Sequence, residues 1–185
     1  RLKIHNEKKY NAIINSIKLI KLLSNISINN TDKYINSVND FIQQNEVYIP
    51  LNNEKQLKKI SKNIIIKDSN TKPIIIEIQF IDDTKKQILF KKEDVRVDYI
   101  ISKIIKFIKY SLNENNISTN LLTYNILPIN NSYGIIEIIE NAHTLYDINE
   151  KLNTSLQNYI LNQNQNETID IIKRKFIHSL AIYSI

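Results

Sequence analysis

Apolar residues in the first half of the chain recur first at helical spacing and then at strand spacing. Between Lys8 and Leu23, and again between Tyr34 and Ile42, they lie three or four positions apart, which predicts two amphipathic helices. Isoleucine-rich runs follow over residues 63–67, 73–78 and 87–90, separated by polar turns, and predict strands joined as hairpins. The expected buried faces are Tyr10, Ile13, Ile14, Ile17, Ile20 and Leu23 in the first helix and Tyr34, Ile35, Val38, Phe41 and Ile42 in the second.

The second half of the chain predicts a helix, a strand pair and a last helix. The first of these helices begins near Arg96, the strands cover residues 121–128 and 134–139, and the last helix covers Ile169–Ile185. Five antiparallel strands with one helix between the third and fourth predict an α+β fold, with that helix packed on one face of the sheet. The order of elements alone leaves other α+β folds open. The expected apolar face of the helix is Val97, Ile100, Ile101, Ile104, Ile105, Ile108 and Leu112.

Composition narrows the class of protein only slightly. With 185 residues, 42% of them hydrophobic, the chain can form one domain or two small ones, and no apolar run reaches membrane-spanning length. The net charge of +6 comes from lysines scattered among acids, which favours a solvated surface, and we expect no nucleic-acid partner. The chain has no cysteine, and its three histidines lack convergent acids, so no metal site is predicted within it.

Lys91 carries the sharpest chemical signal in the chain. It ends a predicted strand, and Glu93, Asp94 and Asp98 follow it into the next helix. In kinases a lysine in this setting contacts nucleotide phosphates, while a carboxylate on the next helix holds it in place. A surface ion pair of little energetic value is the competing interpretation. Lys92 is a second candidate for the same role.

Several segments occur in the order typical of one enzyme family. The stretch Phe90-Lys-Lys-Glu-Asp-Val-Arg-Val-Asp98 resembles a Phe-Lys-x-Gly-Asp-Asp-Leu-Arg-Gln-Asp motif, although the glycine is missing, one position is deleted and valine replaces glutamine. Segments starting at Tyr48 (Tyr-Ile-Pro-Leu-Asn), Gly134 (Gly-Ile-Ile-Glu-Ile-Ile-Glu-Asn-Ala-His-Thr) and Phe176 (Phe-Ile-His-Ser-Leu-Ala-Ile-Tyr) are similar to further motifs of that family. It is the phosphoinositide 3-kinase and 4-kinase superfamily, most closely the 3-kinases, and the resemblance covers residues 49–185.

The resemblance implies where the phosphates of ATP are bound. Lys91, held by Asp94 or Asp98, would contact them from the concave side of the sheet, beneath the turn that contains Ser69. The turn that contains Ser69 matches the loop of the family that covers the phosphates, and its hydroxyl and backbone amides would add contacts. Tyr124 corresponds to a tyrosine at the inner end of the nucleotide pocket, beside Asp98.

The resemblance also implies how adenine is bound. The backbone carbonyl of Glu137 and the amide of Ile139 would supply the acceptor and donor that adenine needs. Ile136, Ile138 and Ile139 would form apolar walls. Ile75 occupies a position where the family often has tryptophan, so a flat stacking surface is replaced by an aliphatic one.

The same resemblance sets the expected organisation and function. It predicts a helical prelude over residues 1–48, a kinase amino-terminal lobe and linker over 49–140, and the beginning of the carboxy-terminal lobe over 141–185. The chain begins with Arg1 and contains neither Asp-Arg-His-x-x-Asn nor Asp-Phe-Gly, so we expect a piece of a longer kinase whose catalytic base and magnesium ligands lie elsewhere.

The parent enzyme would transfer the γ-phosphate of ATP to an inositol-lipid hydroxyl. The implied partners are ATP, a phosphoinositide membrane substrate and a regulatory subunit, and the implied location is cytoplasmic, peripheral to membranes. Three alternatives stay open: a non-catalytic pseudokinase or scaffold, a protein kinase of the phosphoinositide-3-kinase-related group, and a generic interaction module.

Overall fold

The structure, a computed structural model, describes residues 7–26, 30–49, 51–67, 69–117, 119 and 121–184. Pro50, Asp68 and Ile185, which belong to segments predicted above, lie outside the described residues. The chain divides into two compact units. The sheet unit comprises Arg1–Ile104 and Tyr124–Ile138, and the helical unit comprises Ile105–Thr123 and Ile139–Ile185. The predicted domain boundaries at residues 48 and 140 stay predictions.

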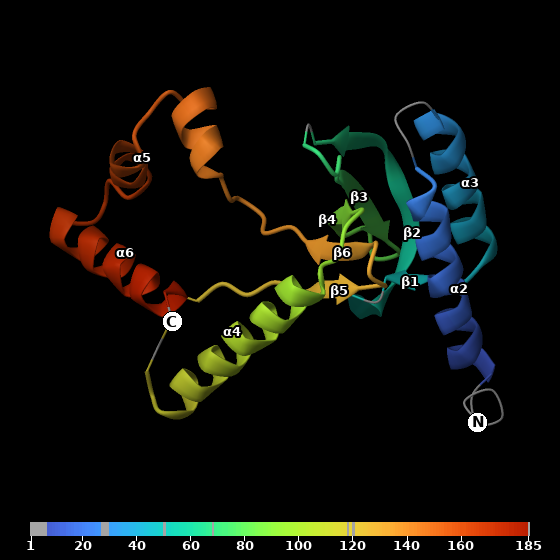
Figure 1. Cartoon of the computed structure of the whole chain (residues 1–185), viewed down its shortest axis with the longest axis horizontal. Coiled ribbons are helices and arrows are strands. Elements are labelled where there is room, and N and C mark those ends of the chain that lie inside the picture. The colour runs from blue at the N-terminus through green and yellow to red at the C-terminus, as the bar shows by residue number, and fades with distance from the viewer. Residues whose placement is uncertain are drawn as a thin grey trace. The chain divides into compact units, whose positions relative to one another are not determined.

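The sheet unit begins with the helix pair that the hydrophobic pattern predicts. α2 (Glu7–Ser24) and α3 (Thr31–Gln44) lie side by side against β1 and β2 (Figure 1). The predicted face of α3 is correct, because Ile35, Val38 and Ile42 are buried. This pair supplies one wall of the hydrophobic core.

The predicted face of α2 is wrong in part. Leu19 and Leu23 are buried, but Ile13 and Ile17 are about half exposed. The buried side of the helix passes through Ser16, whose hydroxyl donates to the carbonyl of Ala12 at 2.8 Å. Because a small hydroxyl satisfied within its own helix can be buried cheaply, the helix faces the core with fewer isoleucines than a count of apolar residues suggests.

Six strands of the described chain form one antiparallel sheet in the order β1-β2-β3-β4-β6-β5. The expected number was five, and the additional strand is β1, which pairs with the beginning of β2. The bounds are β1 Tyr48–Ile49, β2 Asn52–Ile66, β3 Ile74–Phe80, β4 Lys85–Lys91, β5 Ile126–Pro128 and β6 Gly134–Glu137. The predicted strands over 121–128 and 134–139 are therefore shorter in the structure.

The sheet has one buried face and one open face. In β3 burial alternates strictly, with Ile74, Ile76 and Ile78 buried, and the pairing register places Ile88 and Phe90 of β4 on the same side. These residues join those of α2 and α3 in a single core cluster. The opposite side of the sheet, which we call the open face, carries the odd-numbered residues of β3 and β4 because side chains alternate along a strand.

The helix after the sheet, α4 (Arg96–Glu114), begins where the sequence predicts. It is attached through the fully buried Val95, which precedes it and packs against Gly134 of β6. The predicted packing of its apolar face on the sheet is wrong for this structure: Val97 and Ile100 are more than half exposed, and Ser102 is its buried residue. The Ser102 hydroxyl donates to the backbone carbonyl of Tyr124 at 3.0 Å.

The helical unit contains short elements with partial apolar faces. They are the π-helical turn η2 (Asp147–Lys151), α5 (Leu156–Gln163) and α6 (Ile169–Tyr183). The Tyr183 hydroxyl accepts from the amide of Leu122 at 3.1 Å and donates to its carbonyl at 3.0 Å, which ties the end of α6 to the segment before β5.

Candidate functional site

A row of five apolar side chains crosses the open face of the sheet. The strand pairings place Ile65 opposite Ile75, Ile75 opposite Leu89, Leu89 opposite Ile136, and Ile136 opposite Ile126. Directly opposed residues of antiparallel strands project from the same face, so these five form one continuous strip, which we call the apolar row. Ile75, Leu89 and Ile136 are half-buried and Ile65 is exposed. Ile126, at the other end of the row, is buried. The row is an apolar floor with two of the predicted pocket residues, Ile75 and Ile136, near its centre.

Lys91 lies on the open face beside this floor. It is two residues beyond Leu89 on β4 and pairs with Gly134, so it projects from the same side of the sheet as the apolar row. Its side chain is one-quarter exposed and forms an ion pair with Glu93 in the turn before α4. Lys91 ends the strand as predicted, and its placement on the concave side of the sheet stays a prediction. The predicted partners, Asp94 or Asp98, are wrong, because the partner is Glu93.

The two predicted carboxylates have other surroundings. Asp94 is held by Arg96, whose Nε and Nη2 atoms donate to its oxygens at 2.6–3.0 Å and whose amide donates at 3.0 Å. These hydrogen bonds from Arg96 hold the pKa of the Asp94 carboxyl below its usual value. The described part of the chain shows no ion pair or hydrogen bond at the Asp98 carboxylate. Lys92, the rival candidate, donates to the backbone carbonyl of Ile26 at 2.9 Å, so it has a structural role.

Ser69 lies in the turn between β2 and β3. Its carbonyl accepts from the amide of Lys72 at 3.0 Å, and Lys72 has a positive φ of 43°. The register that places Ile66 opposite Ile74 and Ile74 opposite Phe90 puts this turn at the end of the sheet where Lys91 lies. Ser69, which is exposed, and Lys91 therefore lie at the same end of the sheet, as predicted. No interaction joins them in the described structure.

β6 ends at Glu137, which pairs with Ile88 of β4, so its side chain projects from the face of the sheet opposite the apolar row. The Glu137 amide donates to the carbonyl of Asn125 at 2.9 Å, and the amide of Ile138 donates to Gln87 at 3.3 Å. Glu137 follows Gly134 by three residues, so about 10 Å of strand separate it from the Lys91 end at roughly 3.4 Å per residue. Ile139, which is about one-third exposed, begins the second segment of the helical unit.

The Glu137 side chain lies in a dense polar network. Its Oε1 meets Lys86 Nζ at 2.9 Å, and its Oε2 accepts from the amide and side-chain nitrogen of Asn125 at 3.1 and 2.9 Å. Burial alone would raise the pKa of the Glu137 carboxyl, but Lys86 and the two donors of Asn125 outweigh it and hold the pKa below its usual value. Sequence reasoning used only the backbone of Glu137 and missed this network.

Sequence reasoning also missed Leu89, Ile65 and Ile126 as members of the apolar row. The signal for Leu89 was present, because Gln87, Leu89 and Lys91 alternate with the buried Ile88 and Phe90 in β4. Ile65 and Ile126 could not be placed without the cross-strand register. Tyr124, predicted at the inner end of the pocket, lies just before β5, about one-third exposed, with its carbonyl bonded to Ser102.

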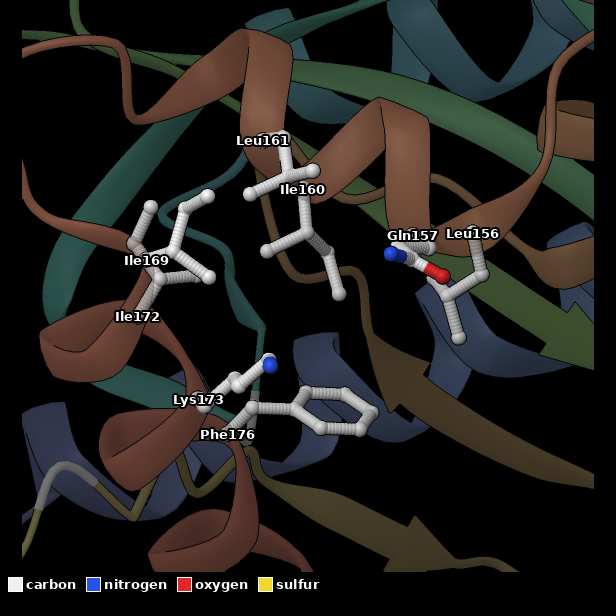
Figure 2. A pocket seen from close by; sticks show the side chains of 8 residues that line it. All are labelled: Leu156, Gln157, Ile160, Leu161, Ile169, Ile172, Lys173 and Phe176. Atoms are coloured by element: carbon white, nitrogen blue, oxygen red, sulfur yellow. The ribbon is translucent and has the colours of Figure 1, made fainter.

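The helical unit contains an apolar groove of about 550 Å³ between α5 and α6. Figure 2 shows Ile160 of α5 and Phe176 of α6 directed into it. The complete lining is Leu156, Gln157, Ile160, Leu161, Ile169, Ile172, Lys173 and Phe176. It contains none of the predicted site residues.

The two histidines within the described residues, His143 and His178, join no cluster of metal-ligating side chains. His143 makes an edge-to-face contact with Tyr159, with ring centroids 5.6 Å apart, and His178, expected to be partly buried, is exposed. In the ranges that the structure describes, no three His, Cys, Asp or Glu side chains gather to hold a metal ion. The described residues therefore do not fit a magnesium site. Among the same residues, no helix is long and apolar enough to cross a membrane.

The order of the helices and strands is consistent with one class of protein, the kinases. A helix pair, a six-stranded antiparallel sheet and then further helices, with α4 between β4 and β5, agree with the amino-terminal lobe of a kinase. A family model, phosphatidylinositol 3- and 4-kinase, matches residues 85–185, which is more than half of the chain. The chain belongs to the phosphatidylinositol 3- and 4-kinase family. No curated protein sequence matches it.

The matched range begins with β4, so it contains Lys91, Glu137 and the helices of the helical unit. Kinases transfer phosphoryl groups, and membership of this family implies the use of ATP with magnesium in general. The match does not separate 3-kinases from 4-kinases.

Proposed function

We propose that the sheet unit is the ATP-binding lobe of a phosphatidylinositol 3-kinase-type lipid kinase. The apolar row receives the flat face of adenine, the backbone of Glu137 and Ile139 bonds the edge of adenine, and Lys91 and Ser69 contact the phosphates. The whole protein transfers the γ-phosphate of ATP to an inositol-lipid hydroxyl, at a membrane surface in the cytoplasm. The predicted domain division at residues 48 and 140 is part of this proposal.

The observation that carries the proposal is the apolar row, which has Lys91 on one side along β4 and the end of β6 at Glu137 on the other side. Nucleotide sites combine an apolar floor with a few placed polar groups. Here the floor and the cation lie on one face of the sheet, and the backbone of the strand end borders the floor at a distance from the cation that suits a base and its phosphates. The features that favour a 3-kinase are the segment that begins at Gly134 and the order of the family-like sequence segments, and Asn-Ala-His-Thr favours a lipid kinase over a related protein kinase.

The test compares ATP with adenosine on the 185-residue chain. We expect ATP to bind weakly, with a Kd on the order of millimolar, equivalent to roughly 4 kcal/mol. Lys91→Ala removes a cation from the phosphate end and is expected to weaken ATP about tenfold while leaving adenosine unchanged. Calorimetric or NMR titration measures both affinities.

A matched control is available on the same strand and face. Lys85 also projects from the open side of β4, where it pairs with Glu77 at 3.0 Å, but it is six residues from Lys91. Lys85→Ala should change neither affinity. Equal losses for ATP and adenosine in Lys91→Ala would show that Lys91 is structural and would remove the phosphate assignment.

One observation favours a second function, a non-catalytic pseudokinase or scaffold. Lys91 is already paired with Glu93, and the Asp98 carboxylate does not hold it. A chain of this kind would bind neither ATP nor adenosine in the titration above. Weak ATP binding that depends on Lys91 would exclude it.

A further inference from the structure

We propose that the Glu137 carboxylate, held between Lys86 and Asn125, is a positioning group that fixes the end of β6 for binding the base. Glu137 enters the proposed site through its backbone, and this inference rests on that proposed function. The side chain itself touches no nucleotide. It acts by holding the backbone atoms that do.

The ladder of backbone hydrogen bonds along β6 stops at Glu137. β6 ends at Glu137, and the next residues leave the sheet for the helical unit. The last two backbone hydrogen bonds from this strand end go to opposite neighbours. The Glu137 amide donates to the carbonyl of Asn125, and the Ile138 amide donates to the carbonyl of Gln87. The second is long, at 3.3 Å, so the ladder alone holds this strand end loosely.

The Glu137 carboxylate reinforces both of these backbone hydrogen bonds, because it contacts Asn125 on one side and Lys86, next to Gln87, on the other. Oε2 receives two hydrogen bonds from Asn125, the residue that already accepts from the Glu137 amide. Oε1 meets Lys86, the neighbour of Gln87 on β4. One side chain therefore links β4 and the segment before β5 across the end of β6.

The contacts of Glu137 with Lys86 and Asn125 can hold the end of β6 in position, but they are too exposed to contribute to the hydrophobic core. The side chains of Lys86 and Glu137 are 41% and 24% exposed, so solvent screens their attraction. The hydrogen bonds of Asn125 add directed, charge-assisted contacts. Losing one partner should loosen the strand end without unfolding the sheet.

Lys85 and Lys86 give an unusually close comparison. They are adjacent in β4 and project to opposite faces, Lys85 toward Glu77 and Lys86 toward Glu137. We expect Lys86→Met to weaken ATP and adenosine by the same factor, about three- to tenfold. Lys85→Met should leave both unchanged, and Lys86→Arg should restore both affinities because the guanidinium also pairs with a carboxylate.

A second variant covers the case in which Lys86→Met unfolds the chain. Glu137→Gln keeps the side-chain volume and the backbone, but it removes the charge that Lys86 pairs with, and it should show the same equal loss for both ligands. Circular dichroism and melting temperature establish that the variants are folded.

The outcomes separate this inference from the proposed function. Equal loss of both ligands in Lys86→Met with recovery in Lys86→Arg supports the positioning role. Unchanged affinities in folded Lys86→Met and Glu137→Gln overturn it and leave the proposed function standing. A wild-type chain that binds neither ligand overturns the proposed function, and this inference with it.

Discussion

Gly134 is the single glycine of the chain, and it lies where no side chain fits. A methyl group at this position would overlap Cγ2 of Val95, which is completely buried, and would lie only 3.1 Å from its Cγ1. Gly134→Ala must therefore move Val95 or the first turn of α4, and forced overpacking of this kind costs about 1–3 kcal/mol. We expect a loss of that size in the free energy of unfolding, measured by urea denaturation.

A double-mutant cycle isolates the cause. Val95→Ala vacates the space that a methyl at Gly134 would occupy, so Gly134→Ala should cost much less in that background than in the wild type. Additive effects of the two substitutions would mean that the backbone of Gly134, and not its contact with Val95, limits the position.

The partner of Lys91 shows what a sequence can predict about one residue. Alternation along β4 predicts the face from which Lys91 projects, because side chains of a strand alternate regardless of the rest of the fold. It does not predict which of three nearby acids the ammonium meets. That choice depends on the path of the turn before α4, where Arg96 engages Asp94 and leaves Glu93 for Lys91.

The β3–β4 hairpin is stabilised by ion pairs that depend on pH. Its turn places Asp82 2.6 Å from Lys55 and Asp83 2.6 Å from Lys58, both from β2. Hydrogen bonds from Lys55 and from Thr84 lower the pKa of Asp82 to about 2. Asp in an unfolded chain titrates near about 3.9, so the unfolded state takes up protons first as the pH falls.

The stability that Asp82 contributes is therefore complete above about pH 4 and is lost as the pH falls toward 2. We expect Asp82→Asn to flatten the pH dependence of unfolding in that interval, measured by denaturation at several pH values. Asp40→Asn is the control, because Asp40 is an exposed residue of α3 that forms no ion pair among the described residues. A wild-type curve without a slope between pH 4 and 2 would contradict the assignment.

At the scale of elements, periodicity predicts what local sequence determines and misses what tertiary contacts determine. The start of α4 and the helix pair follow from the spacing of apolar residues. The first half of β2 is polar, so it does not read as a strand. It forms one because β1 pairs with it and because Asn39 of α3 bonds both the amide and the carbonyl of Ile60, at 2.8 and 3.1 Å.

The same limit explains the errors in α4 and in the candidate site. An amphipathic pattern shows that α4 has an apolar face, but it does not show what covers that face. The apolar row could not be predicted from the sequence for a similar reason, because it crosses five strands whose registers are set by their pairing. Ile75 and Ile136 were predicted from the family resemblance, not from periodicity.

At the scale of the whole molecule, the division into two units gives a prediction about where ATP acts. All the proposed ATP contacts except Ile139 belong to the sheet unit. At ATP concentrations tenfold above Kd, binding stabilises the folded state by about 1.4 kcal/mol. We expect amide hydrogen exchange to slow in β3, β4 and β6 on addition of ATP, and to be unchanged in α5 and α6.

The apolar groove of the helical unit provides an alternative ATP site against which this prediction can be tested. It is a groove in which the flat face of adenine could be held, with Lys173 among its lining residues. Protection of α5 and α6 by ATP, with β4 and β6 unaffected, would move the nucleotide from the apolar row to the groove and refute the proposed site. Lys91→Ala distinguishes the two cases independently, because it should reduce the protection of the sheet, whereas Lys91 is not among the residues that line the groove between α5 and α6.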